Sequence, residues 1–92
     1  TESYNVLMDI SLDEKTKETI MNLVKEHEAI KNCYNLYSTP IGNKYFVVFT
    51  IAVDGEMSTY NSHKLANHLE KDVEALDKID KVVIHVHPEN LT

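Results

Sequence analysis

Arginine is absent from this sequence, although the chain contains nine lysines and fifteen acidic residues. The formal net charge of the 92 residues is therefore -6 at pH 7. Guanidinium groups make most of the bidentate contacts by which proteins grip phosphates and base edges. An acidic chain without them is a poor candidate for binding nucleic acid or an anionic membrane surface. It is better suited to attracting cations.

Cysteine, glycine and long apolar runs are also scarce or absent, and each of these features excludes a class of function or location. Cys33 is the single cysteine, so no disulfide can form within the chain, which fits a reducing compartment. Two glycines are too few for a loop that cradles phosphate through its backbone. No apolar run reaches the roughly 18 residues of a membrane-spanning helix, and no signal-peptide pattern is present. The length predicts a single domain over residues 1–92, with a modest core.

Hydrophobic spacing predicts two helices and three strands. Apolar residues between positions 12 and 28 follow one face of a helix, and Ser11 and Glu14 form a capping-box pattern at its start. A second helix is expected from an N-cap at Ser58 to about Leu76. Strands are expected over residues 30–39, 44–54 and 81–87.

The order α-β-β-α-β predicts a ferredoxin-like, metallochaperone-like α+β sandwich. Its β-α-β part requires a right-handed crossover, which gives a three-stranded sheet with both helices on one face. The strand at 44–54 is apolar on both faces, so it is expected at the centre, between the helices and a partner subunit. Residues 1–10 are interpreted as a lead-in and 89–92 as a tail. Alternation places on one face of the first strand Ile30, Asn32, Tyr34, Leu36 and Ser38.

The most informative feature is a pair of histidines in the last strand, His85 and His87. Alternation puts them on the face opposite Val82, Ile84 and Val86, about 6.5–7 Å apart at the backbone. Imidazole is a good ligand for zinc, copper, iron and nickel. The pair therefore predicts a metal site. Two surface histidines with no ligand role are the alternative, because structural zinc requires four ligands.

The remaining histidines fit a single site less well. His63 and His68 lie on opposite flanks of the apolar stripe of the second helix, about 140° apart, so at most one of them joins the last strand in a site. His27 is interpreted as a helix-end histidine stabilised by the helix dipole, and Cys33 as a small apolar strand residue. The acidic residues of the second helix are expected to form a solvated face, and they are Glu70, Asp72, Glu74 and Asp77. Glu70 and Asp72 are also candidate outer ligands.

Two motifs resemble the cytoplasmic C-terminal domain of cation diffusion facilitator transporters. Residues 62–70, Ser-His-Lys-Leu-Ala-Asn-His-Leu-Glu, resemble the family's Ala-His helix with a terminal Glu. Residues 84–88, Ile-His-Val-His-Pro, resemble its closing His-x-acid-Pro motif. More generic likenesses occur at residues 6–13, 42–47 and 53–58, so the resemblance covers almost the whole chain.

The resemblance implies a homodimeric cytoplasmic domain of an integral membrane transporter that exports divalent cations. It implies metal binding at or near the dimer interface, which draws the subunits together and regulates efflux through the membrane domain. Zinc is the metal it favours most, with cobalt, nickel, cadmium, iron and manganese as alternatives. His63 and His85 fall at histidine ligand positions of zinc-binding relatives. His87 falls where many relatives have aspartate or glutamate.

Two further ligand positions of the family align with Tyr34 and Thr50, neither of which is a good zinc ligand. The full metal cluster of some relatives is therefore expected to be absent, with His68, Glu70 and Cys33 as candidate substitutes. The predicted metal ligands are His63, His68, His85 and His87, and no catalytic residues are predicted.

Three rival functions stay open at this point. A metal-independent dimerisation domain of the same family is favoured by Tyr34 and Thr50. A small-molecule-binding module on the same fold would need Gly-rich ligand loops. A small hydrolase of acylphosphatase-like shape would need an arginine to grip phosphate. The interpretation adopted is a regulatory metal-sensing domain, which is neither an enzyme nor a nucleic-acid binder.

Overall fold

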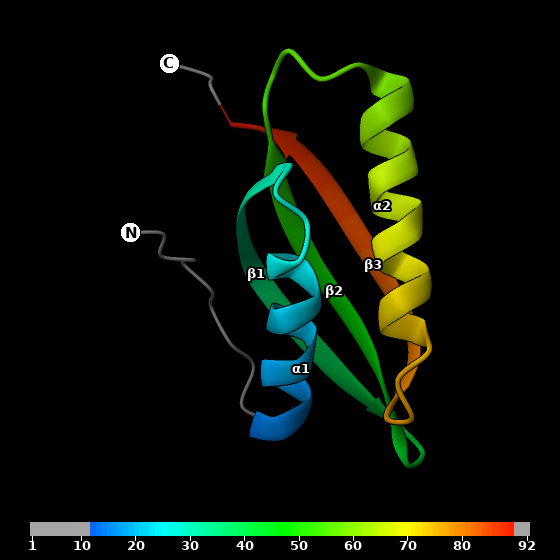
Figure 1. The fold of residues 1–92 in the computed structure, drawn as a ribbon. Coiled ribbons are helices and arrows are strands. Elements are labelled where there is room, and N and C mark those ends of the chain that lie inside the picture. Colours follow the sequence, from blue (N-terminus) through cyan, green and yellow to red (C-terminus); the bar gives the residue numbers. More distant parts are fainter. Residues whose placement is uncertain (1–11, 90–92) are drawn as a thin grey trace.

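The computed structural model describes residues 12–89. The predicted lead-in and the last three residues of the predicted tail lie outside them. Two helices and three strands follow one another along the chain, at α1 (Glu14–Lys25), β1 (Ile30–Ile41), β2 (Lys44–Val53), α2 (Thr59–Glu74) and β3 (Ile79–Pro88). β1 pairs with β2 in antiparallel fashion, and β2 pairs with β3 in parallel. Both helices lie on one face of this β1-β2-β3 sheet (Figure 1), which confirms the predicted sandwich.

Both helices begin at a side-chain cap. Asp13 caps α1, accepting hydrogen bonds from the Thr16 hydroxyl at 2.8 Å and the Thr16 amide at 3.1 Å, and these bonds lower the pKa of the Asp13 carboxyl. The N-cap is therefore Asp13 and not the predicted Ser11, because the Asp13 carboxylate satisfies the free amide of Thr16, the third residue of the helix. Ser11 itself lies outside the described residues. Ser58 caps α2 as predicted, accepting from the Asn61 amide at 3.0 Å.

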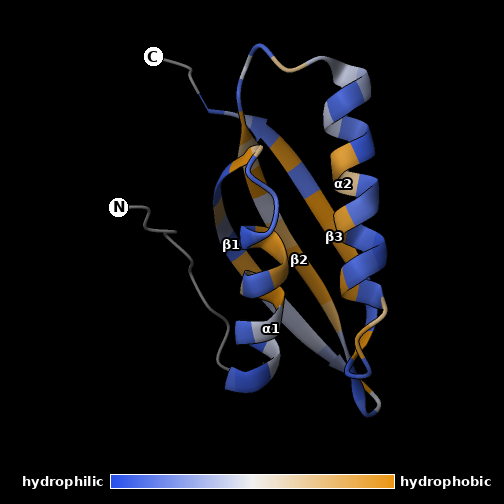
Figure 2. Ribbon diagram, in the orientation of Figure 1, coloured by the Kyte–Doolittle hydropathy of each residue, from blue (hydrophilic) through white to orange (hydrophobic). Residues whose placement is uncertain are grey.

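The core fills the space between the helices and the sheet. Alternate residues of β2, from Val47 to Val53, are buried against it, and Figure 2 shows the apolar sides of both helices turned toward the strands. The helices and β3 contribute the fully buried side chains of Ile20, Val24, Leu69, Val73 and Val82. Val86 lies on the same face of β3 as Val82 but is 38% exposed, so the predicted core set ends before the edge strand does.

β1 departs from simple alternation. Its register with β2 shifts between Ile30 and Asn32 and again between Tyr34 and Tyr37, where Asn35 adopts a positive φ of 58°. Extra residues at such bulges turn the following side chains to the other face. The predicted single face is therefore wrong: Ile30, Leu36 and Ser38 face the helices together with Cys33, whereas Asn32 and Tyr34 face away.

The second face of the sheet carries no helix in the described part of the chain (Figure 1). We call it the open face. Its members alternate with the core residues of each strand and are Asn32, Tyr34, Tyr37, Thr39, Ile41, Lys44, Phe46, Val48, Thr50, Ala52, Lys81, Val83, His85 and His87.

Candidate metal-binding sites

Strand register places the predicted ligand positions in one row across the open face. Tyr34 pairs with Thr50, and Thr50 pairs with His85, while His87 lies one repeat further along β3, opposite Ala52. Both histidines are exposed, and His87 Nδ1 lies 3.4 Å from the Pro88 carbonyl oxygen. The two imidazoles are therefore available to a cation that approaches from the side opposite the helices.

The open face of one chain supplies only part of the ligand set that a metal ion needs. One chain offers two imidazoles, with a phenol and a hydroxyl in the same row from Tyr34 and Thr50. Among residues 12–89, no third His, Cys, Asp or Glu lies close enough to His85 and His87 to share one ion with both. Because zinc binds at least three protein ligands in most sites, further donors would have to come from another chain or from water.

His63 lies on the flank of α2 that faces β3. It is exposed and lines a groove between α2 and β3 with Glu70, Ile84 and Val86. The groove brings an imidazole and a carboxylate to the edge of the sheet that carries His85 and His87. This supports a place for His63 near that edge, apart from His68.

The structure confirms Cys33 as a small apolar strand residue, whereas its candidacy as a substitute ligand and the expected solvated position of Glu74 were wrong. Cys33 is 1% exposed, points into the core beside Ile51, and burial raises the pKa of its thiol to about 12. It therefore cannot substitute for a ligand on the open face. Glu74 is not part of a solvated face, because its carboxylate accepts a hydrogen bond from the Val82 amide on the free edge of β3 at 3.2 Å.

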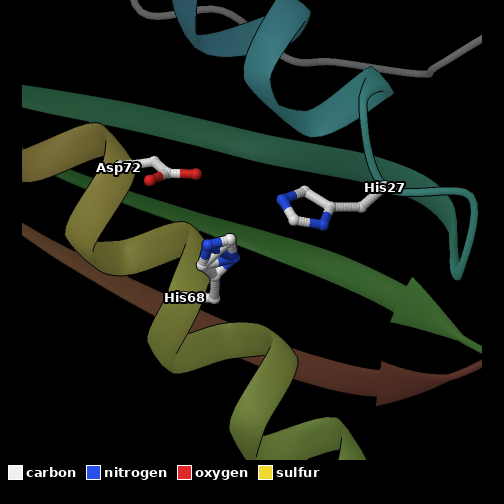
Figure 3. Close-up of side chains that lie close together, drawn as sticks. All are labelled: His27, His68 and Asp72. Carbon is white, nitrogen blue, oxygen red and sulfur yellow. The ribbon is translucent and has the colours of Figure 1, made fainter.

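A separate group of donors lies on the helix side of the sheet. His27, in the turn after α1, meets His68 and Asp72 of α2, and one ligand atom of each lies within 4.8 Å of the others (Figure 3). The rings of His27 and His68 make an edge-to-face contact, with centroids 5.4 Å apart and planes at 88°. We call these three residues the helix-layer cluster.

Sequence reasoning found only part of this cluster. His68 was a predicted metal ligand and Asp72 a candidate outer ligand, while His27 was interpreted as a helix-end residue, a position that the structure confirms. The local signal was the i, i+4 spacing of His68 and Asp72, which puts both on one side of a helix. The position of His27 beside these two residues depends on the packing of α1 against α2.

Residues 12–89 match the family described as the cytoplasmic domain of cation efflux proteins. This chain belongs to that family. The cation-efflux pump FieF of Shewanella oneidensis is 28% identical over 86 residues, and protein p34 of Rickettsia rickettsii is 26% identical over the same length. The chain spans 29% of the length of each of these relatives, so it corresponds to one domain of a longer protein in them.

Solved structures agree with this assignment. The metal-bound C-terminal domain of the CzcD transporter from Thermotoga maritima superimposes with a TM-score of 0.80, at 26% identity, over 94% of this chain and 99% of that one. The cytosolic domain of a cation diffusion facilitator family protein gives a TM-score of 0.79 at 26% identity, over 91% and 100%. The chain is thus a cytoplasmic domain of the cation efflux protein family, which is a family of transporters and not of enzymes. None of the helices in the described residues is long and apolar enough to cross a membrane.

Proposed function

We propose that this domain senses divalent metal and transmits its binding to the transporter through its dimer. The observation that carries the proposal is the row of ligand positions on the open face, which ends in two exposed imidazoles on β3. Zinc suits this donor set best, and cobalt, nickel, cadmium, iron and manganese are the other candidates. The proposed ligands are His85 and His87, with His63 from α2. His68, the fourth predicted ligand, lies on the other flank of α2 against His27 and is not brought to this site.

A two-fold axis would complete the site. Each subunit supplies the same surface patch, so every donor on the open face is duplicated across the interface. Two subunits with a formal charge of -6 each repel one another, and a cation between them offsets part of that repulsion. The ion therefore binds the closed dimer more tightly than the open one and shifts the population toward the closed form.

Regulation of transport is the expected outcome in the full-length protein. The domain itself contains no membrane-spanning helix among its described residues, so transport would belong to a membrane domain joined to it. We propose that movement of the two cytoplasmic domains toward each other is passed to that membrane domain. The partners are then a second copy of this chain and the membrane domain.

A metal-independent dimerisation domain is the second candidate. Tyr34 and Thr50 favour it, because they occupy two places in the row where a stronger ligand would complete the site within one chain. In that case the open face still forms the dimer interface, with its exposed tyrosine and apolar side chains supplying the contact.

Sedimentation velocity of the chelator-stripped 92-residue chain, with and without Zn²⁺, separates the two candidates. Metal sensing predicts that saturating Zn²⁺ lowers the dimer dissociation constant by at least about tenfold, equivalent to about 1.4 kcal/mol. The variant His85→Ala/His87→Ala should lose that response. His27→Gln, on the opposite side of the sheet, is the matched control and should keep it. A wild-type dimer whose dissociation constant is the same with and without Zn²⁺ would support metal-independent dimerisation.

A further inference from the structure

We propose that the helix-layer cluster is a second metal site, formed within one subunit by His27, His68 and Asp72. It would take a divalent transition-metal ion of the zinc class and link the turn after α1 to the middle of α2. The site goes beyond the proposed function, because it needs neither the histidines of β3 nor a second copy of the chain.

The backbone brings the three donors together from two elements. His68 and Asp72 are one helical turn apart on α2, so their side chains leave the helix on the same side. His27 is held on both sides: its amide donates to the Val24 carbonyl oxygen at 3.1 Å, and its carbonyl accepts from the Ile30 amide at 3.1 Å. The cluster thus combines one fixed turn residue with two residues of a rigid helix.

The spacing of the donors is close to that of an occupied site. Tetrahedral ligation at about 2.0–2.1 Å from zinc requires donor atoms about 3.4 Å apart. The ligand atoms of the cluster already lie within 4.8 Å of one another. His68 is exposed, so rotation about its side-chain bonds closes the difference without moving the core.

An unsatisfied nitrogen points independently to a ligand. His27 Nε2 is buried and has no hydrogen-bond partner among the described residues. A buried polar atom without a partner is costly, and its edge-to-face ring contact with His68 supplies no hydrogen bond. A bound ion would give His27 a partner for a ring nitrogen, and the Asp72 carboxylate would offset part of the ion's charge.

The donor types select the class of metal. Two imidazoles and one carboxylate favour zinc, cobalt or nickel over calcium and magnesium, which prefer all-oxygen sites. Three protein ligands leave a fourth position for water, which makes the ion exchangeable. Because the cluster lies on the helix side of the sheet, occupancy would stabilise the helix layer of each subunit and leave the open face unchanged.

The test is a calorimetric titration of the 92-residue chain with Zn²⁺ in the background His85→Ala/His87→Ala, which removes the proposed sheet ligands. We expect one ion per subunit to bind. Adding His68→Gln/Asp72→Asn should weaken that binding at least tenfold, whereas Asn67→Ala, at an exposed position on the same helix that belongs to neither proposed site, should leave it unchanged.

Two outcomes would overturn the proposal: no saturable binding in the background variant, or binding that His68→Gln/Asp72→Asn does not weaken. Thermal unfolding of every variant shows whether the fold is kept.

As a second readout, the imidazole NMR signals of His27 and His68 should shift with one equivalent of Zn²⁺, and unshifted signals would contradict the site. Failure here leaves the metal response of the wild-type dimer intact. Failure of the sensing proposal leaves this one-ion binding intact, so the two results are distinguishable.

Discussion

Single residues of this domain differ in chemical availability according to the face on which they lie. Cys33 is the strongest soft ligand in the sequence, yet the core encloses it and its thiol stays protonated. His85 and His87 are weaker donors, but they are exposed on the open face. Burial therefore decides which side chains can meet an ion from solvent, more than ligand strength does.

Slow alkylation of Cys33 is the expected consequence of its burial. At pH 8 a thiol of ordinary pKa, about 8.5, is roughly one-quarter thiolate, whereas a pKa of about 12 leaves about one part in 10,000. Iodoacetamide should modify the native protein at least about 1,000-fold more slowly than the protein in urea. The native rate should keep rising with pH up to about 12, because the thiolate fraction increases until the pH passes the pKa.

An added cysteine in the hairpin between β1 and β2, Asn43→Cys, provides the matched control because position 43 is exposed. It should react at the rate of an unfolded thiol. Equal rates for Cys33 in native and unfolded protein would show that the thiol is accessible, contrary to the structure.

Among the elements, β1 is the one whose shape depends on a single backbone conformation. Cys33 and Leu36 are three residues apart and would face opposite ways in a regular strand, yet both lie in the core. The bulge at Asn35 makes this possible, since its φ of 58° is in the left-handed region that asparagine and glycine tolerate best.

Substitutions at Asn35 test the bulge. Asn35→Val places a β-branched residue in the left-handed region and should lower the free energy of unfolding by about 1–2 kcal/mol. Asn35→Gly accepts the same φ and should change it by less than about 0.5 kcal/mol. Urea unfolding followed by circular dichroism measures both. Equal destabilisation by the two substitutions would mean that the side chain of Asn35, and not its backbone conformation, is what β1 requires.

Periodicity made the elements predictable, and packing between elements limited the rest. The stripe at Leu69 and Val73 located α2, and the apolar character of both faces of β2 located the central strand. The face of His85 and His87 also followed from alternation, because β3 is regular there. The bulges of β1 interrupt the alternation of its side chains between the two faces, and the spacing of apolar residues in the sequence does not reveal them. The contact of His27 with α2 is set by long-range packing, which spacing along the chain does not encode.

In the whole molecule, the two faces of the sheet carry different groups of side chains. The helices lie on one side of the sheet (Figure 1), where they enclose the core and hold the helix-layer cluster. The open face presents a row of polar and aromatic side chains that ends at the β3 histidines. The net charge of -6 applies to the whole subunit, so two copies repel one another once they come within about one Debye length, roughly 8 Å at physiological ionic strength. A cation bound between open faces is therefore expected to change the distance between subunits.

The most direct test of metal sensing is the distance between the two subunits, measured by pulsed electron paramagnetic resonance. A spin label at Asn43→Cys reports from the exposed hairpin tip, and the buried Cys33 should stay unlabelled. Metal sensing predicts that Zn²⁺ makes the label-to-label distance shorter and its distribution narrower in the otherwise wild-type dimer, and that His85→Ala/His87→Ala abolishes this change. A distribution that is the same with and without Zn²⁺ would show that the dimer does not respond to metal.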